Sequence, residues 1–185
     1  MLDDSTRQRI LSFVRPLDAG LDGVANFGQV EARLARLTRL GAERKGLDEE
    51  LLFLLGVFYG RAKWLGRMGH QSRTQIFLEG LGLPVERLRI FFRSLARAES
   101  EPVSEEEKLV SDADALEKLG AIGLLQGIVD AYRERLELAE TADELVAEQE
   151  RIRFHTPEGK ALARERIVFA RSFAAELRCE LEQQG

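Results

Sequence analysis

The sequence predicts an all-α protein, and three observations support that fold class. Good helix formers (Ala, Leu, Glu and Arg) dominate the composition, and only four prolines occur in 185 residues. No stretch alternates strictly between apolar and polar side chains, as a half-buried strand does. Apolar residues recur instead at three- and four-residue spacing. The chain is 44% hydrophobic and 32% charged, which is typical of a globular protein long enough to bury one core.

Charge and targeting signals narrow the classes of function. The net charge of −5 argues against general binding of nucleic acid. The longest apolar run, Leu51–Tyr59, is too short to cross a membrane. The N-terminus lacks the basic start and apolar segment of a signal peptide, and the single cysteine, Cys179, excludes an internal disulfide framework. We therefore expect a soluble cytoplasmic protein with neither nucleic acid nor membrane as a partner.

Residues 1–24 are expected to form a first helix, capped by Asp4 or Ser5 and ended by Pro16, followed by a loop. Residues 25–185 are expected to pack as one helical domain. Its first helix runs from Asn26 to about Arg44. The predicted buried face comprises Val30, Leu34, Leu37 and Leu40, and the predicted solvent face comprises Glu31, Arg33, Arg36 and Arg39.

The next helix should lie at the centre of the domain. Asp48 is its predicted cap, and residues 51–59 are apolar almost all round. Gly60 ends it, and residues 61–69 are interpreted as a basic loop. His70 and Pro84 then begin two further helices.

Two more helix starts are marked in the second half of the chain. Ser104 and Glu107 form a capping box, and Thr156 before Pro157 is a strong start signal. Between them we expect a helix over residues 121–138. The last helix should reach Gln184 with a predicted inward face of Leu162, Phe169, Phe173, Leu177 and Leu181.

The stretch Leu109–Gly123 carries two carboxylates inside an apolar helical pattern. Asp112 lies at the edge of the apolar face, and Asp114 points roughly the other way. A carboxylate at the edge of a core needs a metal, a cation or several hydrogen-bond donors as its partner. The alternative is a capping or surface aspartate.

Residues 112–123, Asp-Ala-Asp-Ala-Leu-Glu-Lys-Leu-Gly-Ala-Ile-Gly, resemble the Asp-Ala-Asp-Arg-Leu-Asp-Ala-Leu-Gly-Ala-Ile-Gly signature of a bacterial branch of the HD superfamily of metal-dependent phosphohydrolases. Residues 30–34 align with that family's His-x-x-Arg-Val, and residues 55–60 with its Ala-Ala-Leu-Leu-His-Asp. Residues 156–166 are similar to its Thr-x-x-Gly-x-x-x-Ala-x-x-Arg. The resemblance covers roughly residues 25–178 and implies a single-domain, all-α HD-type bundle.

The resemblance also identifies what this chain has lost. In the family, a His, a consecutive His-Asp pair and a later Asp hold divalent metal, which activates water against a phosphoester. Here Val30, Tyr59 and Gly60 stand at the first three positions, and only Asp112 remains. Val and Gly offer no donor atom, so we expect no metal and no other cofactor.

Two sets of residues around this pocket are candidates for new roles. In the resemblance, His70 corresponds to an extra His that some relatives use. We expect His70 to be a helix-start residue or a hydrogen-bonding partner of Asp112, and not a metal ligand. Nearby cations are candidates for pairing with Asp112 or for binding an anion: Arg33, Arg61, Lys63, Arg67 and Arg73. The alternative is that residues 61–69 are a solvated basic run.

We expect a catalytically degenerate HD-type protein that acts as a ligand-binding or regulatory module. A phosphate-containing small molecule is the expected partner, and a homodimer is the expected assembly. One alternative is a residual metal-dependent phosphohydrolase acting on a nucleotide or another phosphoester. The three positions without the family's ligands argue against enzyme activity but do not decide it. Another is a purely structural protein whose cavity has closed.

Overall fold

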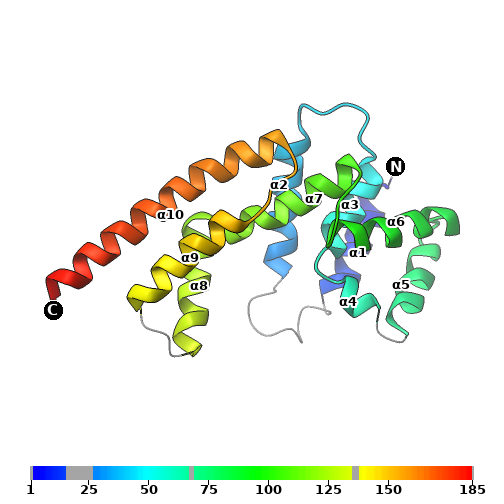
Figure 1. Ribbon diagram of the computed structural model, residues 1–185. Coiled ribbons are helices and arrows are strands. Elements are labelled where there is room, and N and C mark those ends of the chain that lie inside the picture. The colour runs from blue at the N-terminus through cyan, green and yellow to red at the C-terminus, as the bar shows by residue number, and fades with distance from the viewer. Residues whose placement is uncertain (1, 16–26, 67–68, 135–137, 185) are drawn as a thin grey trace. The chain divides into compact units, whose positions relative to one another are not determined.

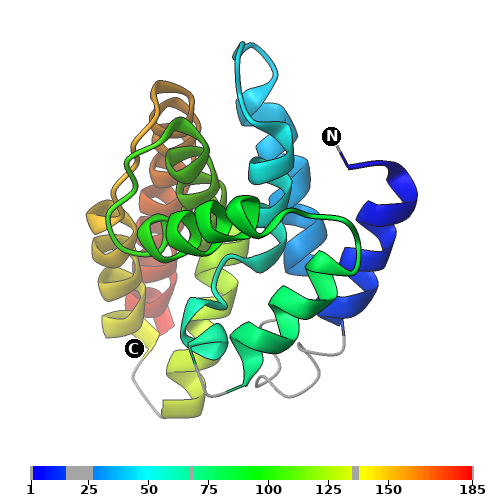
Figure 2. The ribbon, with the colours of Figure 1, turned by 90° about the vertical axis from the view of Figure 1, so that its right-hand side faces the viewer.

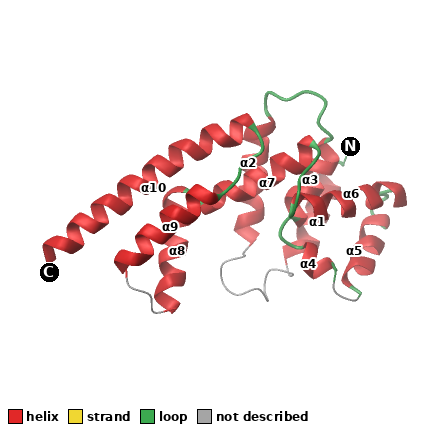
Figure 3. Cartoon of the chain, viewed as in Figure 1, coloured by secondary structure: helices red, strands yellow, loops and turns green. Residues whose placement is uncertain are grey.

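The computed structural model describes residues 2–15, 27–66, 69–134 and 138–184. All regular structure in these ranges is helical, and none of them contains a strand (Figure 3). The predicted all-α fold class is therefore confirmed. The chain divides into two compact units, Met1–Ala113 and Asp114–Gly185. The division at residues 24 and 25 stays a prediction.

The first unit is built around α3. Its helices are α1 (Asp4–Val14), α2 (Phe27–Gly41), α3 (Glu49–Phe58), α4 (Ala62–Leu65), α5 (His70–Glu79), α6 (Val85–Ala98) and most of α7 (Glu105–Ala115). α3 packs against α1, α2 and α6 (Figures 1 and 2). Leu54, Leu55, Val57 and Phe58 are completely buried on it, and the Phe58 ring meets Phe91 edge-on at 5.4 Å. The predicted central helix is thus confirmed.

Side-chain caps fix where these helices begin. Asp48 Oδ1 accepts the Leu51 N–H at 3.0 Å, as expected for the start of α3. At α7, Ser104 Oγ accepts the Glu107 N–H and Glu107 Oε2 accepts the Ser104 N–H, both at 3.2 Å, which confirms the capping box. For α1 the predicted cap is wrong, because Asp3, and not Asp4 or Ser5, accepts the Thr6 N–H.

The second unit contains a short 3-10 turn, η2 (Leu116–Lys118), followed by α8 (Gly120–Glu134), α9 (Leu138–Arg151) and α10 (Pro157–Gln184). The three helices pack against one another (Figure 1). α8 and α9 approach closely at Gly127, where a Cβ atom would lie 2.1 Å from Leu145 Cδ2. Thr156 Oγ1 accepts the Gly159 N–H at 3.0 Å, so the predicted start of α10 is confirmed.

The predicted inward face of α10 is partly wrong. Phe169 and Phe173 are exposed, whereas Ala163, Ala170 and Ala174 are buried. Small side chains let the backbones of packed helices approach closely, so the alanines form the contact and the aromatic rings lie outside it. The side chain of Leu181 lies outside the described part of the chain. None of the described helices combines the length and apolar character that a membrane crossing requires.

Candidate functional site

The positions singled out by the resemblance lie on three elements of the first unit, and α2 connects them. Arg33 Nη1 donates to the carbonyl oxygens of Gly56 and Tyr59, at 3.1 and 3.3 Å, where α3 ends. One turn later, Arg36 Nη1 donates to the carbonyl oxygen of Ala113 at 2.9 Å, next to Asp112 on α7. The ends of α3 and α7 are therefore both bound to the same stretch of α2.

Two buried arginines meet at the end of α3. Arg61 Nη1 donates to the carbonyl oxygens of Val57 and Tyr59, at 3.0 and 3.3 Å, so it shares the Tyr59 oxygen with Arg33. Only 5% of Arg33 and 7% of Arg61 is exposed. The last carbonyls of a helix lack partners within the helix and carry partial negative charge, which favours cations there.

The predicted solvent face of α2 is therefore wrong at Arg33. The prediction followed the helical period, which places charged residues on the wet side. The carbonyl oxygens where α3 ends accept from the buried guanidinium, and the helical period of α2 does not reveal these acceptors. The Arg33 guanidinium also lies over the Tyr59 ring, with 5.3 Å from Cζ to the ring centroid.

Tyr59 and Gly60 are engaged in contacts of their own. The Tyr59 hydroxyl donates to the Ala98 carbonyl oxygen at 3.3 Å. Gly60 turns the chain with a φ of +83°, a conformation that side chains disfavour. Its N–H donates to Glu99 Oε1 at 2.9 Å, and the same oxygen accepts the Ala62 N–H at 3.0 Å. Glu99 was not predicted from the sequence, because an acidic residue at a helix end carries no specific signal.

The other two positions that the resemblance aligns with metal ligands, Val30 and Asp112, are buried. Asp112 was predicted at the edge of the apolar face, and instead it is completely buried. The predicted pairing of Asp112 with an arginine stays a prediction.

These residues do not fit an HD-type metal. Val30 and Gly60 have no side-chain donor, and the Tyr59 hydroxyl is bound to Ala98. Among the described residues, no three His, Cys, Asp or Glu side chains gather into a group that could hold a metal ion. A metal-activated water is therefore not part of the chemistry that we derive for this site.

The other candidate residues are spread over α4, α5 and the chain between them. The predicted basic loop is partly helical, because Ala62–Leu65 form α4. His70 begins α5, as predicted, and is half-buried, while Arg73 is exposed on the same helix. Arg67 and the side chain of Lys63 lie outside the described part of the chain.

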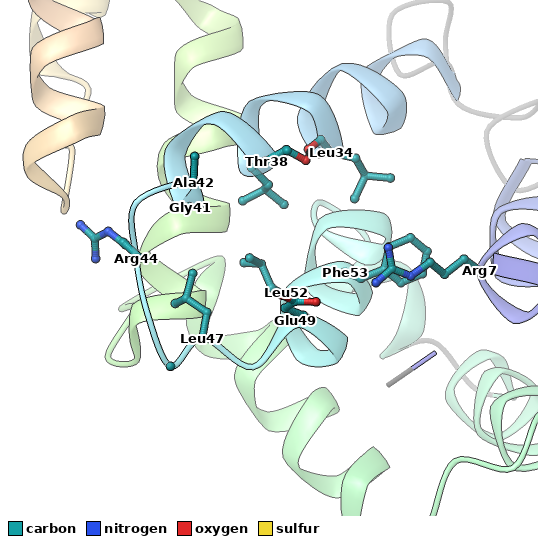
Figure 4. Close-up of a pocket in the computed structure, with 12 residues that line it drawn as sticks. Arg7, Leu34, Thr38, Gly41, Ala42, Arg44, Leu47, Glu49, Leu52 and Phe53 are labelled. Atoms are coloured by element: carbon teal, nitrogen blue, oxygen red, sulfur yellow. Dashed lines mark hydrogen bonds between the residues drawn. The ribbon is translucent and has the colours of Figure 1, made fainter. Parts of the chain in front are cut away.

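A cavity of about 540 Å³ lies elsewhere in the first unit, beside the C-terminal half of α2 and the N-terminal half of α3 (Figure 4). Leu37, Leu52 and Phe53 contribute to its apolar wall. Three polar side chains at this cavity make contacts: Arg44 pairs with Glu105, the Thr38 hydroxyl donates to the Leu34 carbonyl, and the Arg7 guanidinium lies over the Phe53 ring. No residue of the candidate site lines this cavity.

Comparison with known proteins identifies the fold. No family model and no curated protein sequence matches the chain. Solved structures match over nearly its whole length. The Lin1889 protein from Listeria innocua has a TM-score of 0.76 and 18% identity, covering 98% of both chains. An HD-superfamily hydrolase from Bacillus thuringiensis has a TM-score of 0.76 and 16% identity, covering 96% of this chain and 97% of that one. The chain has the HD-superfamily fold. Bacillus subtilis YpgQ, solved in complex with ADP, matches this HD-type fold with a TM-score of 0.72 and 17% identity, covering 94% of both chains.

Proposed function

We propose that this HD-type chain is a catalytically degenerate module that binds a phosphate-bearing small molecule without metal and acts by that binding. One observation carries the proposal: the buried guanidiniums of Arg33 and Arg61 meet at the carbonyl oxygen of Tyr59. In the resemblance, Tyr59 and Gly60 occupy the positions of the His-Asp pair. Two fixed positive charges would thus have replaced a divalent cation.

The charges around Tyr59 favour an anion. Two guanidiniums bound to one oxygen repel each other strongly where little water screens them. The carbonyls at the end of α3 offset part of this repulsion. In the proposal, the carboxylates of Asp112 and of Glu99, which accepts the Gly60 and Ala62 N–H groups, offset part of the positive charge, and a bound phosphate accepts from the guanidiniums. Guanidinium suits this role because its planar donors match the oxygens of carboxylate and phosphate in a forked geometry.

A nucleoside diphosphate is the first ligand to test, because the structurally similar YpgQ was solved with ADP. Calorimetry with ADP and with pyrophosphate, both in the presence of a chelator, separates recognition of phosphate from recognition of the nucleoside. We expect binding by the native chain and at least a tenfold loss of affinity in Arg61→Met. Arg89→Met is the matched control, since Arg89 is an exposed arginine on α6 that pairs with Glu86. No heat at millimolar ligand would contradict the proposal.

The role of Asp112 needs a separate measurement. A double-mutant cycle of Asp112→Asn and Arg33→Met reports the coupling between the two side chains in the free energy of unfolding. We expect coupling of about 1 kcal/mol or more, because opposite charges that lie close together in the protein interior stabilise each other. Additive effects would mean that Arg33 is not the counter-ion of Asp112; the cycle is then repeated with Arg61→Met.

A residual metal-dependent phosphohydrolase is the alternative function. It would require hydrolysis of a phosphoester that depends on manganese or iron and is lost in Asp112→Ala. Release of phosphate from a panel of nucleotides and sugar phosphates, with metal and with chelator, distinguishes the two. We expect no metal-dependent turnover, since only Asp112 of the four ligand positions keeps a metal-binding side chain.

A further inference from the structure

The cavity beside α2 and α3 has the size and the lining of a small-molecule site (Figure 4). Its volume of about 540 Å³ falls within the roughly 300–1,000 Å³ of ligand pockets, which are mostly apolar with a few polar groups. The apolar side chains of its wall come from α2, α3 and the chain between them: Leu34, Leu37, Leu47, Leu52 and Phe53. The described lining residues all belong to the first unit, and none of them belongs to the candidate site. A ligand in this cavity is therefore separate from the phosphate proposed above.

Arg7 on α1 provides a cationic group at this cavity. Its Cζ atom lies 5.2 Å from the centroid of the Phe53 ring, so the guanidinium lies over an aromatic side chain of the wall. The Nε atom of Arg7 is buried, and no described residue accepts a hydrogen bond from it. The N–H donors of a guanidinium lie in its own plane, so contact between its face and a ring leaves them available to an acceptor. A buried donor without an acceptor costs free energy, and an anionic group of a ligand would supply that acceptor.

Two further charged side chains are found among the described lining residues, Arg44 and Glu49. Arg44 pairs with Glu105 and points away from the apolar wall in Figure 4. Glu49 is exposed, so water screens its carboxylate. Arg7 is therefore the charged group that is best placed to select the charge of a ligand.

We propose that this cavity binds a small organic molecule that has an apolar body and one carboxylate group. The body packs against Leu37, Leu52 and Phe53, and the carboxylate accepts hydrogen bonds from the Arg7 guanidinium. Guanidinium suits this role because its forked donors match the two oxygens of a carboxylate. The wall supplies affinity in proportion to the apolar area that it covers, and Arg7 supplies selectivity for the anion.

Calorimetry of the full chain with octanoate, heptanoate and 1-octanol tests both parts of this proposal. We expect octanoate to bind with a dissociation constant below about 1 mM. Heptanoate should bind about fourfold more weakly, because it buries one methylene fewer. Octanol should bind about tenfold more weakly than octanoate, because its hydroxyl makes no charge-assisted hydrogen bond. No binding of octanoate at millimolar concentration, or octanol binding as tightly as octanoate, overturns the proposal.

Substitution of Arg7 tests which side chain holds the carboxylate. Arg7→Met keeps a long side chain and removes the charge, so we expect about a tenfold loss of octanoate affinity with little change for octanol. Unchanged octanol binding also shows that the variant is folded. Arg9→Met is the matched control, because Arg9 is an exposed arginine on α1 that is not among the described lining residues. Octanoate affinity that stays the same in Arg7→Met, or falls equally in Arg9→Met, overturns the proposal.

A second pair of variants locates the ligand with Arg7 in place. Thr38 is exposed on α2 and lines the cavity, so Thr38→Glu adds a carboxylate there, and Thr38→Gln adds similar volume without charge. We expect Thr38→Glu to bind octanoate several-fold more weakly than Thr38→Gln, because like charges repel, and both variants to bind octanol equally. Equal octanoate affinities in the two variants would mean that the carboxylate binds outside this cavity, which overturns the proposal.

Discussion

Glu107 holds the start of α7, the helix that carries Asp112, and replacing it should be costly. Its carboxylate is completely buried and pairs with Arg97. It also accepts the N–H groups of Val103 at 2.8 Å and Ser104 at 3.2 Å. Burial acts to raise the pKa of Glu107, but the hydrogen bonds from Arg97 and the backbone outweigh it, so the pKa lies below its ordinary value of 4.5.

The expected cost of Glu107→Ala follows from these contacts. Loss of the reciprocal cap costs about 1 kcal/mol. Loss of a charge-assisted hydrogen bond costs about 1.5–3 kcal/mol. The Arg97 side chain is 41% exposed and water can solvate it again, so the full penalty of a stranded buried charge does not apply. We expect a total of about 3 kcal/mol.

Glu105 on the same turn provides a matched control. It pairs with Arg44 and Lys108, but half of its side chain is exposed, so Glu105→Ala should cost less than about 1 kcal/mol. Equilibrium unfolding in denaturant, followed by helical circular dichroism, measures both. Because the folded pKa of Glu107 is depressed, its contribution to stability is present above pH 4.5 and is lost as pH falls through the folded pKa. Equal losses for the two variants at neutral pH would refute this reasoning.

Three further predictions concern the core, a close contact and metal. Phe58→Ala should cost about 3–5 kcal/mol in denaturant unfolding, because Phe58 is completely buried on α3; a loss under about 1 kcal/mol would contradict its central position. Gly123→Ala should destabilise the chain by about 1–3 kcal/mol despite the better helix propensity of alanine, because the new Cβ would lie 2.0 Å from the Lys118 carbonyl oxygen; unchanged thermal unfolding would refute that contact. Elemental analysis of protein purified without chelator should find no stoichiometric iron, manganese or zinc; such a metal, lost in Asp112→Ala, would contradict the expectation that these positions hold no metal.

Much of the fold could be predicted because its signals are local. Asp48, Ser104 with Glu107, and Thr156 before Pro157 each mark a helix start through a side chain and a backbone N–H a few residues away. The apolar run of α3 predicted its central place. The buried face of α10 could not be predicted in the same way, because it depends on the size of the side chains and not on their hydrophobicity. Its alanines are buried, and its phenylalanines Phe169 and Phe173 are exposed.

The candidate site was harder to predict because its partners are distant in sequence. The resemblance named Val30, Tyr59, Gly60 and Asp112, but it could not indicate which side chains from other helices surround them. Arg33 was assigned to solvent by its helical period, and its burial depends on carbonyls of α3 that lie 23 and 26 residues further along the chain. Arg61 was likewise assigned to a basic loop, and its burial was not predicted. A cation is stable in a protein interior when charge and acceptors surround it, and the carbonyl oxygens where α3 ends supply such acceptors to both arginines. Arg33 comes from the adjacent helix α2, and Arg61 comes from the chain just after Gly60. Both donate to the same backbone oxygen, and in the proposed function the phosphate binds beside it.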